Sequence, residues 1–268
     1  YFCSTEKSSY KIINNDNVEL KINELNLNSK YIKNRSAGNI IHYTAENIPA
    51  YRREYMSPEF DKFAPIVKVS PKKFRLREVD GYAENWDDFG KWSYQELYAG
   101  RNSIPESTKD EISNLVQGIT SPIDKAKIIY QYVQDKTRYI SVQLGIGGWQ
   151  PMLASQVDEV SYGDCKALTN YTKALMESQG IEAYHTILYG GRELKNIENN
   201  FVSLQGNHMI LNLPNDGDPI WLECTSQKVP FGHIANFTDD RDVLVITPEG
   251  GRIEHTKVYT SKENYLKT

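Results

Sequence analysis

The stretch from residue 1 to residue 84 alternates apolar and polar positions in short runs, a pattern typical of β-strands. Residues 18–23 alternate strictly, as a half-buried strand does. Residues 40–44 and 66–69 are β-branched runs bounded by turn residues, and prolines punctuate the second half of the stretch. We therefore expect residues 1–84 to form a β-rich accessory domain.

From residue 85 the spacing of apolar positions becomes helical. Asn85 can cap a first helix. A second helix is predicted over residues 106–117, with Ile112, Leu115 and Val116 facing inward. A third helix is predicted to begin at Ser121, because a capping residue is followed there by Pro122 at the first helical position. These helices open a second predicted domain, residues 85–268.

Another helix is predicted after residue 165, and the chain then returns to β-type patterns. The candidate strands are residues 183–189, 208–213, 220–224, 242–247 and 252–259. Helices followed by an antiparallel meander indicate an α+β fold, since alternating βαβ units are missing from the order.

Composition and charge narrow the function classes. Of the 268 residues, 39% are hydrophobic and 25% charged, which suits a globular core. A formal net charge of -4 gives no overall attraction to nucleic acid or an anionic membrane. The sequence contains no apolar run long enough to span a bilayer. It begins without an initiator Met or a signal pattern, so we expect a fragment or a processed product. Nothing indicates the oligomeric state.

Cysteine and glycine spacing point to no cofactor. The three cysteines, Cys3, Cys165 and Cys224, are too few for a disulfide scaffold, and no Cys/His spacing fits structural zinc. The glycines of residues 145–148 fit neither the dinucleotide nor the phosphate-loop pattern. We therefore expect neither a metal nor a cofactor. By strand parity, Cys224 is expected in the core.

Cys165 is the first candidate for chemistry. It follows Gly163 and Asp164, at the point where a predicted turn ends and a predicted helix begins. The unpaired N–H groups and the positive dipole end of a helix start favour thiolate, the nucleophilic form of cysteine. The alternative is a small core residue within an amphipathic helix.

His208 and Glu223 lie on two strands joined by a strong hairpin signal at residues 215–218. If residues 216–217 form the turn, His208 lies opposite Thr225 and Glu223 is its diagonal neighbour. If residues 215–216 form it, His208 faces Glu223 directly. Both registers put His208 and Glu223 on one face, where the carboxylate could orient the imidazole. A surface His–Glu pair is the alternative, and His185 is the best substitute base.

Several motifs together resemble the transglutaminase-like superfamily of papain-like cysteine enzymes. The matching pieces are residues 138–151 (RYISVQLGIGGWQP), 162–166 (YGDCK), 207–208 (NH) and 221–225 (WLECT). The resemblance covers roughly residues 85–260 and is greatest to the bacterial branch with an N-terminal DUF3857-type domain, of which residues 1–84 would be part. It implies a papain-like core, with the cysteine helix packed on an antiparallel sheet.

The resemblance implies a role for each matching residue. Cys165 takes the place of the nucleophile, His208 of the base and Glu223 of the orienting acid. We expect the Cys165 N–H, with a side chain such as Gln143 or Trp149, to stabilise the oxyanion. The chain departs from the family pattern in having Glu for the usual Asp, Met after the His, and Lys-Ala after the Cys.

The sequence thus predicts a cysteine-dependent amide hydrolase or acyltransferase that forms a thioester on Cys165. Hydrolysis of a peptide or protein amide is favoured over transfer, because no feature identifies an amine site. The alternative is a catalytically idle binding or scaffold module. A redox role for Cys165 is weaker, since no resolving cysteine lies close in sequence. From the resemblance, we expect a periplasmic or otherwise exported protein.

Overall fold

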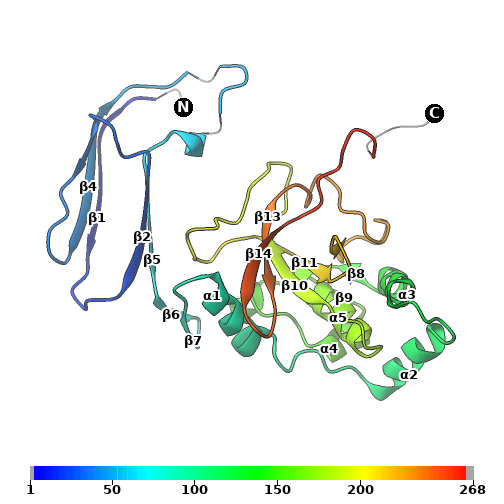
Figure 1. Cartoon of the computed structure of the whole chain (residues 1–268). Coiled ribbons are helices and arrows are strands. Elements are labelled where there is room, and N and C mark those ends of the chain that lie inside the picture. Colours follow the sequence, from blue (N-terminus) through cyan, green and yellow to red (C-terminus); the bar gives the residue numbers. More distant parts are fainter. Residues whose placement is uncertain (1–2, 53, 59, 264–268) are drawn as a thin grey trace. The chain divides into compact units, whose positions relative to one another are not determined.

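The change from strand to helical spacing corresponds to a division of the chain into two units, Tyr1–Phe74 and Arg75–Thr268. The computed structural model describes residues 3–52, 54–58 and 60–263 (Figure 1). The boundary falls ten residues before the expected one, because β7 (Val79–Tyr82), the pairing partner of β6 (Lys73–Leu76), packs against the first helix. The indole N–H of Trp92 donates to the carbonyl oxygen of Asp80 over 2.9 Å and fastens β7.

The first unit consists of β-strands, as its alternating pattern predicts. Three strands pair in the antiparallel order β1-β4-β3, and two further strands, β2 and β5, pair with each other. Their bounds are Thr5–Ile13 for β1, Leu20–Leu25 for β2, Ile32–Asn34 for β3, Ile40–Ile48 for β4 and Ile66–Pro71 for β5. The hydroxyl of Tyr43 on β4 donates to Glu24 on β2 and links the two groups of strands.

The second unit begins with helices that start where the sequence places caps. The Asn85 side chain accepts from the N–H of Asp88 (2.9 Å), and Ser121 caps the third helix in the same way. The prediction for Leu115 is wrong: its helix ends there, and the side chain is 45% exposed while Ile112 is buried. The helices are α1 (Trp86–Trp92), α2 (Glu106–Leu115), α3 (Pro122–Lys136), α4 (Ala154–Val160) and α5 (Cys165–Glu177).

Five strands of the second unit form an antiparallel sheet, but not a simple meander. Its order is β12-β11-β10-β13-β14, because β13 returns to pair with β10 instead of continuing beyond β12. The strands are β10 (Tyr184–Leu188), β11 (His208–Leu213), β12 (Ile220–Leu222), β13 (Asp242–Ile246) and β14 (Gly251–His255). A mixed helix and antiparallel-sheet architecture is thus present, as the α+β prediction requires.

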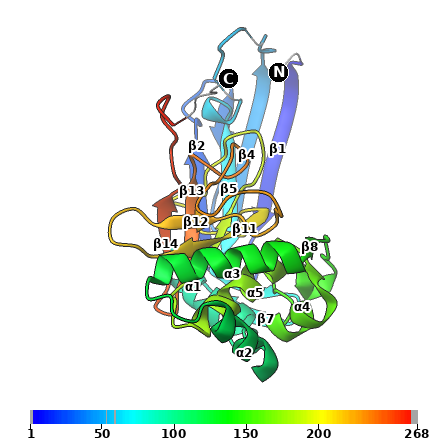
Figure 2. The ribbon, with the colours of Figure 1, turned by 90° about the vertical axis from the view of Figure 1, so that its right-hand side faces the viewer.

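Helix α5 is the central element of this unit. It packs against β10 and β11 on one side and against α3 and α4 on the other (Figure 2). All its residues except Glu177 are buried, so its position is fixed by contacts all around. The main core joins α5 to side chains such as Ile129 of α3 and Leu211 of β11. In the described part of the chain, no helix is long and apolar enough to cross a membrane.

Candidate active site

Cys165 is the first residue of α5, and the turn that precedes it fixes its position. Asp164 caps the helix, with its Oδ1 accepting from the backbone N–H of Ala167 over 3.0 Å. Gly163 is required just before it, since a Cβ there would lie 2.6 Å from the Cβ of Ala167. The thiol therefore sits at the positive end of a thirteen-residue helix, the environment that favours thiolate.

A short parallel strand pair fixes this turn from outside the helix. Strand β8 (Arg138–Tyr139) pairs with β9 (Tyr162–Gly163), and the N–H of Ile140 donates to the carbonyl oxygen of Gly163 over 2.9 Å. The segment after β8 continues to Gln143, which lies in the wall of a cavity.

That cavity has a volume of about 590 Å³, and Cys165 and His208 both line it. Cys165 is only 4% exposed, so a reactant reaches the thiol through this cavity. Volumes of 300–1,000 Å³, roughly, are usual for small-molecule sites. The predicted oxyanion residues Gln143 and Trp149 line the same cavity.

His208 begins β11 and bonds to Glu223, which follows β12. The imidazole Nε2 lies 2.9 Å from Oε2 and 3.2 Å from Oε1 of Glu223. Leu211 lies opposite Leu222, which is the register expected for a turn at residues 216–217. Both side chains are 9% exposed, so this is a buried pair and not the surface pair of the alternative interpretation.

Thr225 holds the Glu223 carboxylate, a role that the sequence analysis missed. Its backbone N–H (3.1 Å) and its hydroxyl (2.5 Å) both donate to Oε1. These bonds, with the imidazole, lower the pKa of Glu223, although burial acts to raise it. The register that puts Thr225 opposite His208 was the only signal available for this role.

The same contacts set the charge of His208. Burial acts to lower the pKa of the imidazole, but hydrogen bonds and charges from Cys165 and Glu223 raise it to about 10. Since Glu223 occupies Nε2, Nδ1 is the ring nitrogen left to bond the thiol of Cys165. The structure thus brings Cys165, His208 and Glu223 together in that order, as a nucleophile, a base and an orienting acid require.

Phe237 packs on the free side of His208, also unforeseen from sequence. The ring centroids are 5.3 Å apart in an edge-on arrangement. Gly190 makes room for it, since a Cβ there would lie 2.6 Å from the Phe237 ring. The fully buried Arg241 donates to the carbonyl oxygen of Tyr189 and thereby secures the strand end next to Gly190.

We expect Phe237→Ala to slow alkylation of Cys165 below pH 7 by roughly tenfold, since an edge-on aromatic pair contributes about 0.5–1.5 kcal/mol. The His208 ring would lose the contact that restrains it opposite Glu223. The rate is measured with iodoacetamide by intact mass. Phe237→Tyr keeps the ring and should retain the wild-type rate; an equal loss in both variants would contradict a role for ring packing.

His185 does not replace His208 as a base. It is 2% exposed, and both ring nitrogens lack hydrogen-bond partners among the described residues. Its ring centroid lies 4.6 Å from that of Tyr98, in a tilted arrangement. Burial, followed by the charge of Lys173, lowers the pKa of His185 to about 3. It therefore stays neutral and outside the cavity wall.

The remaining thiols and possible ligands offer no second site. Cys224 is buried in the main core, as predicted, and burial raises its pKa to about 12. Cys3 is exposed in the first unit. Within residues 3–52, 54–58 and 60–263, no three His, Cys, Asp or Glu side chains are grouped as a metal site would need.

Comparisons with known proteins give a fold and little more. No family model and no curated protein matches the chain. A solved structure of a "putative protease" from Parabacteroides distasonis is similar, with a TM-score of 0.55 and 15% identity over 94% of this chain and 45% of that one. A "putative cysteine protease" from Cytophaga hutchinsonii has a TM-score of 0.37 and 13% identity, over 83% of this chain and 66% of that one.

The Parabacteroides likeness shows a shared fold across both units of this chain. The chain spans less than half the length of that structure. At 15% identity, the activity in its name stays with that protein.

Proposed function

We propose that the chain is a cysteine-dependent amide hydrolase or acyltransferase of the papain-like, transglutaminase-like kind, with hydrolysis of a peptide amide favoured. The buried Cys165–His208–Glu223 relay, open to a cavity at its cysteine end, carries the proposal. The sequence motifs around the three residues support the same class of enzyme. Their resemblance to the bacterial branch with a DUF3857-type domain supports a partial domain of that type in the first unit.

The geometry supports a specific sequence of steps. The thiolate of Cys165 attacks the amide carbonyl carbon, and the π electrons of the carbonyl move onto its oxygen. The Cys165 N–H, with Gln143 or Trp149, would donate to that oxyanion. As the intermediate collapses, the C–N bond breaks and the imidazolium of His208 gives its proton to the departing amine. A thioester remains on Cys165.

The second half of the reaction uses the same residues. His208, now neutral, takes a proton from water, and the oxygen attacks the thioester carbon. The C–S bond breaks and the thiolate is regenerated beside the imidazolium. With an amine in place of water the product is a new amide, so the acceptor alone separates hydrolysis from transfer.

A catalytically idle module is the competing proposal, and two observations weigh against it. Glu223 has one methylene more than the usual Asp, yet His208 and Thr225 bond both of its oxygens. The cavity also reaches Cys165, so access to the thiol is not blocked.

Alkylation with iodoacetamide across pH tests the relay without a known substrate. We expect Cys165 to react rapidly below pH 7, since a thiolate paired with imidazolium persists below the ordinary thiol pKa of about 8.5. Cys165→Ala should abolish this labelling, and His208→Ala should reduce it to the rate of an ordinary thiol. If wild-type Cys165 reacts no faster than N-acetylcysteine and His208→Ala changes nothing, the relay is not assembled and the idle module is correct.

A further inference from the structure

The cavity that reaches Cys165 has a wall of apolar and polar side chains in similar proportion, contributed by segments far apart in sequence. Helix α1 and the π-helical turn that follows it contribute buried aromatic and aliphatic side chains. The loop before α4, β10 and the segment leading into β11 contribute further lining residues. The apolar side chains are Phe89, Trp92, Leu97, Trp149, Ile187 and Leu204.

Leu204 is the exposed member of this wall. Its side chain is 51% exposed. It stands three residues before Asn207, whose side chain bonds the backbone of Gly190 through both its nitrogen and its oxygen. The segment is therefore fixed, and Leu204 is held at the cavity instead of folding into the core.

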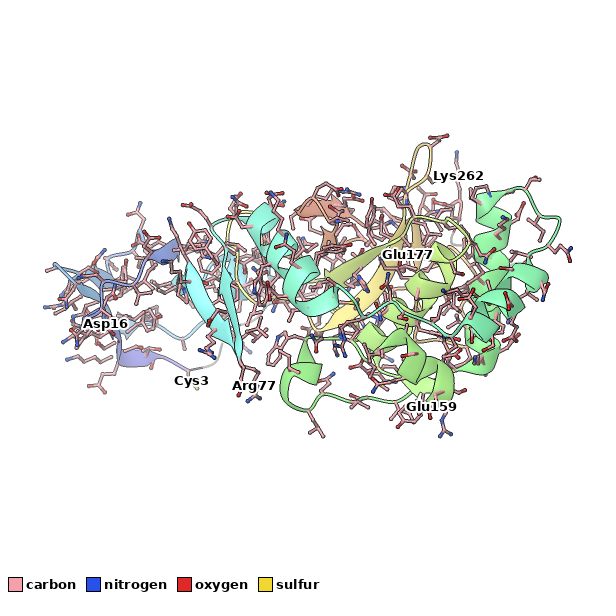
Figure 3. The ribbon with its side chains drawn as sticks, turned by 90° about the horizontal axis from the view of Figure 1, so that it is seen from below. Cys3, Asp16, Arg77, Glu159, Glu177 and Lys262 are labelled. Carbon is pink, nitrogen blue, oxygen red and sulfur yellow. The ribbon has the colours of Figure 1, made fainter. Side chains whose placement is uncertain are left out.

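Apart from Cys165 and His208, the ionisable groups with a basic side chain along the described lining of the cavity are Arg77 and Lys166. Among the described residues that line it, none is Asp or Glu. Lys166 is neutralised by an ion pair with Asp164. Arg77 is exposed at the end of the β6–β7 hairpin (Figure 3), and the described residues give it no ion-pair partner.

From the residues that line the cavity, we propose that the site prefers amide substrates whose acyl residue carries a large apolar side chain. A basic side chain at the same position is disfavoured. The inference rests on the proposed function. An apolar side chain would bury its surface against the aromatic and leucine wall. A lysine side chain of similar length would bring an ammonium beside Arg77, into a pocket whose described lining has no carboxylate to pair with it.

Peptidyl chloromethyl ketones test the inference directly, because they place a side chain next to an electrophile that alkylates a catalytic cysteine. Three probes, acetyl-Ala-X-chloromethyl ketone with X as norleucine, lysine or alanine, differ in length or in one ammonium group. The measurement is the rate of Cys165 labelling by intact mass. We expect norleucine to exceed both lysine and alanine by at least about tenfold, in keeping with apolar-pocket discrimination of 1–3 kcal/mol per missing group.

A carboxylate introduced at Leu204 should reverse the charge preference. We expect Leu204→Asp to lower the norleucine-to-lysine rate ratio by about tenfold. Leu194→Asp is the matched control, since Leu194 is 56% exposed ten residues earlier and does not line the cavity. Its ratio should remain that of the wild type. Because each ratio is taken within one protein, a general change in thiol reactivity cancels.

The outcomes separate this inference from the proposed function. Rapid labelling that depends on His208 but shows equal rates for norleucine and alanine, or faster labelling by lysine, overturns the side-chain preference and leaves the proposed function standing. An unchanged norleucine-to-lysine rate ratio in Leu204→Asp overturns the assignment of Leu204 to the pocket for this side chain. No labelling of Cys165 by any probe above the rate of N-acetylcysteine overturns both.

Discussion

Glu223→Gln is expected to destabilise the fold by about 3–5 kcal/mol near pH 6, because it removes one partner of a buried ion pair. The variant leaves the His208 imidazolium 2.9 Å from a neutral amide, in a site where both side chains are 9% exposed. His208 must then either stay charged without a partner or release its proton. Because burial favours the neutral imidazole once the carboxylate is gone, we expect His208 to release its proton. The imidazolium that would hold Cys165 as thiolate is then lost, and rapid alkylation below pH 7 with it.

The pH dependence of this destabilisation follows from the two pKa shifts. The pKa of His208 is raised to about 10, so its contribution is complete below the unfolded value of about 6.5 and is lost as the pH rises through 10. The pKa of Glu223 is lowered, so its contribution is present above about 4.5 and is lost as the pH falls. The difference in the free energy of unfolding between wild type and Glu223→Gln should therefore be largest near pH 6 and become steadily smaller towards pH 10.

Urea unfolding at pH 5.5, 7 and 9 measures this difference. Glu159→Gln is the control, since Glu159 is an exposed carboxylate on α4 without an ion-pair partner among the described residues. It should change the free energy of unfolding by less than about 0.5 kcal/mol at each pH. A destabilisation by Glu223→Gln that is small and equal at all three pH values would show that no buried imidazolium–carboxylate pair contributes to stability.

Gly90→Ala is the second large effect, with an expected loss of about 3 kcal/mol in the free energy of unfolding, at the upper end of the usual cost of overpacking. Gly90 lies in α1, where replacing Gly by Ala ordinarily stabilises a helix by up to about 1 kcal/mol. Here a Cβ would lie 2.0 Å from the backbone nitrogen and 2.3 Å from the Cα of Gly251. Both atoms are backbone at the start of β14, so α1 must move away from the sheet.

The same movement should reach the cavity, since Phe89 and Trp92 of α1 line it. Gly147→Ala is the matched control, because its Cβ would meet nothing within 4 Å and its backbone has no positive φ. Chemical denaturation of both variants is the measurement. Equal stabilities for the two would mean that α1 does not pack on β14 as closely as the structure places it.

Much of the site was predictable because its parts are encoded locally. The Gly163–Asp164–Cys165 turn needs only a capping carboxylate and a glycine, both visible in the sequence. Strand periodicity of two put His208 and Glu223 on one face in either register. The sequence left the register open, and the turn at residues 216–217 became certain only from the observed pairing of β11 with β12.

Local patterns failed where the determinant was a partner distant in sequence. Leu115 fits a helical apolar stripe, but whether that stripe meets a core depends on where its helix ends. The sheet order places β13 beside β10, which depends on long-range pairing and not on the alternation within either strand. His185 had the residue type of a base, but burial beneath Tyr98 keeps it neutral.

The sequence by itself determined the α+β class, the helix starts and the three candidate site residues, because caps, periodicity and turn chemistry act between near neighbours. Only the tertiary structure decided that Thr225 and Phe237 hold the relay, and that Arg77, Trp92 and Leu204 share one cavity with Cys165. These side chains meet because separate elements pack together, and the free energy of that packing belongs to contacts across the fold that no single stretch of sequence contains.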